Sequence, residues 1–256
     1  MSRAGLFLRL AILALFTLVT IGPQALAVRF GWSWAGIVPI LFHRLVLRLF
    51  DIRVQEQGEP PGSDATLVLA NHVSWIDIPV IGSLQPLSFI AKSEVRTWPG
   101  VGVLARLQRT VFIDRKSRRA TAEVTRTVAH RLVRGEVIVL FAEGTTGDGN
   151  RILPFRSSLV GAAQAALTDS TTGRVLLQPL AITYTRRGGL PVTRRERPEI
   201  CWYGDMELAP HIARFAKAGP LDVTVVWGEP QPFCGDRKQA TMLAEQAVRE
   251  AIAATR

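Results

Sequence analysis

Residues 66–77 read Thr66-Leu67-Val68-Leu69-Ala70-Asn71-His72-Val73-Ser74-Trp75-Ile76-Asp77, and no other part of this chain says more about its fold and its chemistry. The first five residues form an apolar run that is typical of a buried strand. The residues that follow place a histidine five positions before an aspartate, where the strand should finish and a helix begin. Ser74 is expected to cap that helix, which should open at Trp75.

A histidine and an aspartate at this spacing suit acid–base chemistry. The imidazole of His72 is the side chain best suited to take a proton near neutral pH. A carboxylate at Asp77 that reaches the other ring nitrogen would fix the tautomer and stabilise the imidazolium that forms. No serine or cysteine nucleophile accompanies the pair, so we expect the nucleophile to be a hydroxyl of the substrate.

Three further blocks repeat the pattern of an apolar run that ends in polar residues. One block is Val137-Ile138-Val139-Leu140-Phe141-Ala142-Glu143-Gly144-Thr145-Thr146. Another begins at Gly102-Val103-Leu104 and ends in Thr110-Val111-Phe112-Ile113-Asp114-Arg115. The last is Val175-Leu176-Leu177-Gln178-Pro179-Leu180-Ala181-Ile182.

In order, type and spacing, the four blocks resemble the motifs of the glycerolipid acyltransferase family, which includes the 1-acylglycerol-3-phosphate acyltransferases. The resemblance covers about residues 66–184. It implies an O-acyltransferase in which His72, oriented by Asp77, removes the proton from an acceptor hydroxyl as that hydroxyl attacks an acyl thioester. Transfer would be direct, without an acyl-enzyme, and backbone amides near the first block would stabilise the oxyanion. Four residues are implied in acceptor binding, namely Arg115, Glu143, Gly144 and Thr145, and Arg115 would hold the anionic head.

Two residues depart from the family pattern, and one of them bears on the acceptor lipid. Ala142 stands where the family usually has proline. Thr146 stands where it usually has an arginine that is associated with the acceptor's phosphate, and Arg151 and Arg156 follow closely. The run 146–157 looks like the bacterial branch that includes lyso-ornithine lipid acyltransferases, whose acceptor has no phosphate. The sequence therefore favours lyso-ornithine lipid, acylated to ornithine lipid, and leaves lysophosphatidic acid, acylated to phosphatidic acid, as the alternative.

The first 57 residues are expected to anchor the protein in a membrane. Nineteen uncharged residues run from Leu10 to Val28, enough to span a bilayer, and a second uncharged stretch covers residues 30–42. Arginines flank both stretches, which indicates that both ends face the cytoplasm of a bacterial inner membrane. We favour an in-leaflet helical hairpin because the second arm is short; two short passes and a cleaved signal peptide are the alternatives. Residues 41–50 should continue as a helix, either on the membrane surface or on the catalytic core.

Composition narrows the partners. The net charge is +10 at pH 7, so anionic lipid, nucleic acid and acidic proteins are all conceivable partners. No nucleic-acid motif and no interleaved stacking aromatics occur, so we expect an anionic membrane surface and an acyl carrier protein or acyl-coenzyme A donor, not nucleic acid. Two cysteines and four scattered histidines predict neither a metal nor an organic cofactor. An inactive, membrane-tethered basic binding module is the alternative of a different class.

Residues 58–256 are expected to form the catalytic domain. Helical stretches at 74–84, 117–134, 155–168 and 236–256 alternate with strand-like runs at 66–70, 87–91, 110–113, 137–141, 175–184 and 222–228. This alternation predicts an α/β fold with a mixed, largely parallel sheet flanked by helices and preceded by the membrane helical hairpin. His72, Asp114 and Glu143 each follow a strand-like run, so one crevice at the carboxyl ends of the strands should collect them.

Overall fold

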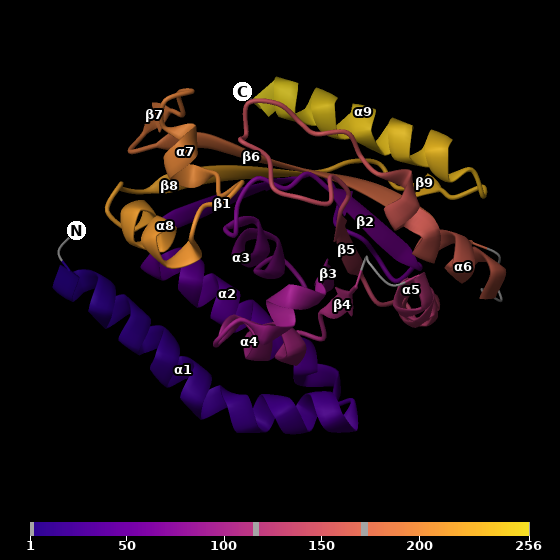
Figure 1. Cartoon of the computed structure of the whole chain (residues 1–256), viewed down its shortest axis with the longest axis horizontal. Helices are drawn as coiled ribbons and strands as arrows, with labels where there is room; N and C mark the ends of the chain where they lie inside the picture. The colour runs from indigo at the N-terminus through magenta and orange to yellow at the C-terminus, as the bar shows by residue number, and fades with distance from the viewer. Residues whose placement is uncertain (1–2, 115–117, 170–173, 256) are drawn as a thin grey trace.

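One mixed sheet with helices on both faces organises this chain, as the computed structural model in Figure 1 shows; it describes residues 3–114, 118–169 and 174–255. The main strands lie in the order β1-β8-β6-β2-β5-β3-β4, and every neighbouring pair is parallel except β6 with β8. Their bounds are Ile52–Gln57 (β1), Thr66–Ala70 (β2), Ser88–Lys92 (β3), Val111–Ile113 (β4), Ile138–Phe141 (β5), Leu176–Arg187 (β6) and Leu221–Trp227 (β8). The short β7 (Leu190–Pro191) and β9 (Gln231–Pro232) pair antiparallel with β6. The predicted mixed, largely parallel sheet is confirmed.

Two hydrophobic clusters lie on opposite faces of the sheet, and β2 contributes to both. Val68 and Ala70 pack into one cluster, whereas Leu67 and Leu69 pack into the other. All four are fully buried, which explains why the strand reads as an unbroken apolar run. Helices α2 (Ile37–Leu49), α3 (Asp77–Gly82), α4 (Val101–Leu107) and α8 (Leu208–Phe215) lie on one side, and α5 (Arg118–Val133), α6 (Gly161–Asp169) and α9 (Arg237–Thr255) lie on the other (Figure 1).

The chain begins with a pair of helices that run back along each other, α1 (Arg3–Phe30) and α2, joined through a short 3-10 turn at Ser33–Gly36 (Figure 1). Residues Ala4–Phe30 form the one helix within the described residues that is long and apolar enough to cross a membrane. Two polar contacts fasten α1 along its length. Arg9 donates to the Asp51 carboxylate at 3.0 Å, and the Gln24 amide donates to the carbonyl oxygens of Ala35 and Leu107 at 2.8 and 2.9 Å.

The second helix belongs to the hydrophobic core. Val46, Leu47 and Phe50 are buried in the cluster that α3 and α8 share. Of the two positions predicted for residues 41–50, the structure therefore shows the one on the catalytic core. The next strand, β1, lies inside the stretch 1–57 for which the sequence predicts an anchoring role, and it pairs with β8 from Ile52 to Gln57.

Several elements differ from the sequence prediction. The helix predicted over 74–84 is the shorter α3, and the strand predicted over 175–184 extends to Arg187. Strand β1 and the short helices α4, α7 (Arg197–Ile200) and α8 were not predicted. Strand β1 escapes prediction because only Ile52 of its six residues is buried, so its sequence lacks a continuous apolar run.

Candidate active site

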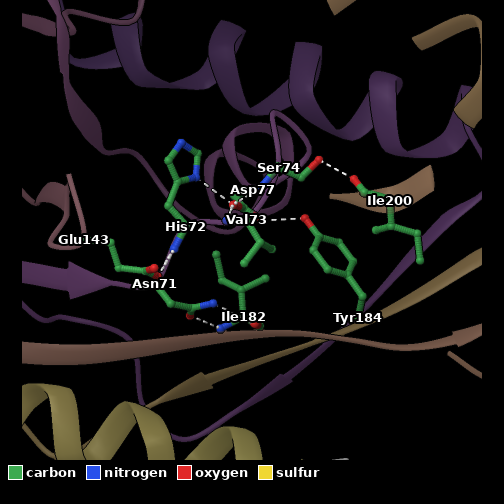
Figure 2. Close-up of polar contacts among 9 residues, drawn as sticks. All are labelled: Asn71, His72, Val73, Ser74, Asp77, Glu143, Ile182, Tyr184 and Ile200. Atoms are coloured by element: carbon green, nitrogen blue, oxygen red, sulfur yellow. Dashed lines mark hydrogen bonds and ion pairs between the residues drawn. The ribbon is translucent and has the colours of Figure 1, made fainter. Parts of the chain in front are cut away.

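His72 and Asp77 meet at the carboxyl end of β2. Nδ1 of His72 lies 2.7 Å from Oδ2 of Asp77. The same oxygen accepts the backbone N–H groups of Val73 and Ser74 at 2.8 and 2.9 Å, so the tight turn between strand and helix closes around the carboxylate (Figure 2). The Asp77 side chain is fully buried, whereas 18% of the His72 side chain is exposed.

The other ring nitrogen of His72 is the atom that is available for chemistry. Nε2 has no hydrogen-bond partner among the described residues, and the ring stacks on Phe141 with centroids 3.8 Å apart and planes at 14°. An imidazole that keeps its proton on Nδ1, facing a carboxylate, leaves an unprotonated Nε2 that can act as a general base.

Contacts from distant parts of the chain hold this segment in place. The N–H of Gly147 donates to the His72 carbonyl, and the N–H of Trp202 donates to the Val73 carbonyl, both at 2.8 Å. The hydroxyl of Ser74 donates to the Ile200 carbonyl at 2.6 Å. The prediction that Ser74 caps the following helix is therefore wrong. Helix α3 starts at Asp77 without a side-chain cap, because a loop far away in the sequence takes the serine hydroxyl.

Glu143 is fully enclosed, and both of its oxygens bind backbone. Oε1 accepts the N–H of His72 at 2.8 Å, and Oε2 accepts the N–H of Leu153 at 2.9 Å. Burial raises the pKa of the Glu143 carboxyl from 4.5 to about 7, although these two N–H groups act in the opposite direction. Glu143 therefore joins the catalytic segment to the loop that follows β5.

The other residues implied in acceptor binding have different surroundings. Gly144 is buried at φ 72°, a conformation that favours glycine, and its N–H donates to the Phe141 carbonyl at 3.0 Å. Thr145 is exposed. Thr146, partly buried, directly precedes Gly147 and so lies one residue from the contact with His72. Arg115 lies outside the described residues.

A small cavity of about 30 Å³ adjoins the segment that carries the dyad. Glu143, Tyr184, Arg151 and Arg197 contribute to its lining. Arg197 donates from Nη1 to the Gly149 carbonyl at 2.7 Å, whereas Arg151 is exposed. Within the described ranges, no group of three or more histidine, cysteine or acidic residues is placed to hold a metal ion.

The structure adds a partner to the dyad that sequence analysis missed. The hydroxyl of Tyr184, on β6, donates to Oδ1 of Asp77 at 2.5 Å (Figure 2). The two residues are 107 positions apart. Tyr184 directly follows Thr183 at the end of the apolar run of the last block, and that position was the only signal in the sequence.

Comparison with known proteins gives consistent matches. The family described as Acyltransferase matches residues 51–183. A protein of Brucella abortus (strain 2308) named lyso-ornithine lipid O-acyltransferase is 43% identical, covering 95% of this chain and 92% of that protein. A protein of Rhizobium meliloti (strain 1021) with the same name is 40% identical, covering 94% and 83%. The crystal structure of the 1-acyl-sn-glycerophosphate acyltransferase from Thermotoga maritima aligns with a TM-score of 0.53 and 23% identity, covering 95% of this chain and 97% of that one, so the two share a fold.

Proposed function

This chain belongs to the acyltransferase family and is an enzyme that transfers an acyl group to a lipid hydroxyl, and from that premise we propose that its acceptor is lyso-ornithine lipid and its product ornithine lipid. The observation that carries this proposal is the 43% identity to a lyso-ornithine lipid O-acyltransferase over nearly the whole length of both chains. Thr146 supports it, because an acceptor without a phosphate needs no arginine at this position.

In the proposed mechanism, His72 is the general base. Its Nε2 takes the proton of the acceptor hydroxyl as the hydroxyl oxygen attacks the carbonyl carbon of the thioester. The new C–O bond forms, the C–S bond breaks, and the proton passes from the imidazolium to the departing sulfur. Asp77 holds the tautomer and stabilises the imidazolium during the transfer.

The proposed acyl donor is a thioester of acyl carrier protein or of coenzyme A. Both are acidic molecules, and the net charge of +10 suits either of them as well as an anionic membrane surface. Arg115 is proposed to hold the anionic head of the acceptor. Glu143, Gly144 and Thr145 are proposed to shape the acceptor site, Glu143 through the backbone that it fixes.

Residues 1–57 are proposed to anchor the enzyme in the bacterial inner membrane as an in-leaflet hairpin, with the domain that follows facing the cytoplasm. The contacts of α1 support this arrangement. Because Arg9 and Gln24 tie two distant points of the helix to Asp51 and Leu107, α1 lies along the rest of the protein and does not project away from it. Its outer side is strongly apolar, with Phe7, Leu15 and Leu18 each more than half exposed.

Lipid profiling tests the acceptor directly. A strain that lacks the gene should accumulate lyso-ornithine lipid during growth at low phosphate, and the wild-type gene should restore ornithine lipid. The gene for His72→Ala serves as the matched control and should restore nothing. Unchanged ornithine lipid in the deleted strain, together with loss of lysophosphatidic acid acylation, would replace the proposed acceptor with lysophosphatidic acid.

A purified enzyme assay separates the acyltransferase from a binding module. Turnover should depend on His72, and the same preparation should acylate lyso-ornithine lipid faster than lysophosphatidic acid. Full lipid acylation by His72→Ala would show that this residue does not carry the reaction.

A further inference from the structure

The two oxygens of Asp77 have separate partners. Oδ2 faces His72 and also accepts the N–H groups of Val73 and Ser74. Oδ1 has one donor among the described residues, the hydroxyl of Tyr184 at 2.5 Å. The orientation of the carboxylate toward the imidazole is therefore held from one side by backbone and from the other by this phenol.

Tyr184 approaches Asp77 from the side opposite to His72. Figure 2 shows the phenol ring rising from β6 to the carboxylate, with the imidazole on the far side. The pairing of β6 with β8 shifts register between Tyr184 and Arg186, and such irregularities redirect the side chains next to them. The strand that carries Tyr184 also binds Asn71, so one element supports both ends of the His72 segment.

We propose that Tyr184 is a positioning residue of the dyad, whose hydroxyl holds Oδ1 of Asp77 and so keeps Oδ2 directed at Nδ1 of His72. This inference rests on the proposed roles of His72 and Asp77 in acyl transfer. Short O–H···O⁻ hydrogen bonds are among the stronger ones in proteins. Tyr184 acts through the carboxylate and takes no proton itself.

The surroundings keep the phenol in the form that this role requires. Burial, followed by the negative charge of Asp77, raises the pKa of Tyr184 well above its ordinary value. The hydroxyl therefore stays protonated and donating over the pH range in which the enzyme works. Its hydrogen bond is strongest when the imidazole is neutral and the carboxylate bears its full charge, so the bond favours the unprotonated, active form of the dyad.

Replacement of Tyr184 by phenylalanine removes the hydroxyl and keeps the ring. We expect kcat of the full-length enzyme in detergent to fall about 10- to 100-fold, the usual worth of a hydrogen bond to a charged group, with KM for lyso-ornithine lipid unchanged. The acid limb of the profile of kcat/KM against pH should move to higher pH, because the dyad gains a proton more easily once Oδ1 has lost its donor. A purely structural defect lowers activity equally at every pH.

A double-mutant cycle identifies the route of the effect. In an Asp77→Asn background, Tyr184→Phe should change kcat by less than about threefold, because the partner of the hydroxyl is gone. Tyr203→Phe is the matched control, since Tyr203 is the other tyrosine of the chain and its hydroxyl donates to no described residue. It should leave the melting temperature and the pH profile unchanged.

The outcomes separate this inference from the proposed mechanism. If His72→Ala and Asp77→Asn are inactive but Tyr184→Phe has a normal kcat and pH profile, the positioning role is wrong and the dyad stands. A raised KM at constant kcat would instead make Tyr184 a substrate-binding residue and overturn the proposal. High activity of His72→Ala would remove the dyad mechanism itself. Melting temperatures of all variants separate these results from unfolding.

Discussion

The side chain of Asn71 pairs with the backbone of Ile182 as one more residue of strand β2 would. Its Oδ1 accepts the N–H of Ile182 at 2.8 Å, and its Nδ2 donates to the Ile182 carbonyl at 3.1 Å. The regular pairing of β2 with β6 ends just before, at Ala70 with Leu180. The amide therefore extends the contact between the strands while the backbone turns away toward His72.

Replacement of Asn71 by alanine should destabilise the protein. Asn71 and Ile182 are both 2% exposed, so the freed N–H and C=O groups of Ile182 would lose their partner in a buried place. We expect the free energy of unfolding to fall by about 1–3 kcal/mol and the melting temperature by several degrees. Thermal unfolding in detergent measures both. Asn150→Ala is the control, because Asn150 is exposed and its amide bonds to Asp148 two residues away; an equal loss there would contradict the special role of Asn71.

Loss of the imidazole should abolish most of the activity without unfolding the protein. We expect His72→Ala to lower kcat by about 10²–10⁴-fold, the usual contribution of a positioned general base. The exposed His130 provides the matched control, and His130→Ala should have wild-type turnover. Near-normal turnover of His72→Ala in detergent would exclude His72 from the mechanism.

Conversion of Asp77 to asparagine should be almost as severe for a different reason. An amide nitrogen that faces Nδ1 would donate to it, so the ring proton would move to Nε2, the atom that must be free to accept one. The variant should bind lyso-ornithine lipid with little change in KM while kcat collapses. A raised KM with normal kcat would place Asp77 in substrate binding.

The sequence predicted the catalytic pair because both partners lie within one short turn. The buried central strands were equally readable, since strands that are covered on both faces carry continuous apolar runs, as β2 and β5 do. The role of Asn71 and the contact of Tyr184 with Asp77 join residues more than 100 positions apart, and no local pattern marks such pairs. The serine hydroxyl at position 74 was misjudged for the same reason, because its acceptor at Ile200 comes from a distant loop.

The buried carboxyl of Glu143 should make stability depend on pH. Its pKa is raised from 4.5 to about 7 in the folded protein, so the folded state holds a proton that the unfolded chain has released. The stabilisation that this proton brings is fully present below about pH 4.5 and is lost as the pH rises through about 7. Between these limits, wild type should lose about 3 kcal/mol relative to Glu143→Gln, which does not titrate. Unfolding of both proteins from pH 4.5 to 7.5 measures the difference, and a constant difference would show that Glu143 does not titrate in this range.

The outer side of α1 should determine membrane association. Phe7, Leu15 and Leu18 are 72%, 62% and 74% exposed, so changing all three to serine removes apolar surface from the membrane without opening the core. The variant should shift from the membrane to the soluble fraction at an unchanged melting temperature. Leu190→Ser is the control, since Leu190 is 72% exposed on the short β7. Equal release of wild type and the triple variant would contradict the proposed anchor.

Cysteine labelling distinguishes the in-leaflet hairpin from a spanning helix. With the exposed Cys234 changed to serine, a cysteine introduced at Ala4 should react with an impermeant maleimide in inside-out vesicles but not in intact spheroplasts. An in-leaflet hairpin keeps both of its ends on the cytoplasmic side. Labelling of residue 4 from the outside, with the active site inside, would establish a spanning α1.

The acceptor is tested most directly at Thr146, where related enzymes carry an arginine. Thr146 precedes Gly147, whose N–H binds the His72 carbonyl, so a side chain introduced here lies beside the catalytic segment. An acceptor that lacks a phosphate offers no partner to an arginine at this place. Thr146→Arg should therefore leave kcat/KM for lyso-ornithine lipid unchanged or lower.

The same variant should improve the use of lysophosphatidic acid. A charge-assisted hydrogen bond to its phosphate is worth roughly 1.5–3 kcal/mol, so kcat/KM should rise by about 10- to 100-fold. Arg151 and Arg156 provide the comparison, since either of them can already hold a phosphate; in that case Thr146→Arg would do little and Arg151→Ala or Arg156→Ala would be costly. Robust wild-type turnover of lysophosphatidic acid with none on lyso-ornithine lipid would overturn the proposed acceptor, because Thr146 would then stand in an enzyme that binds a phosphate without it.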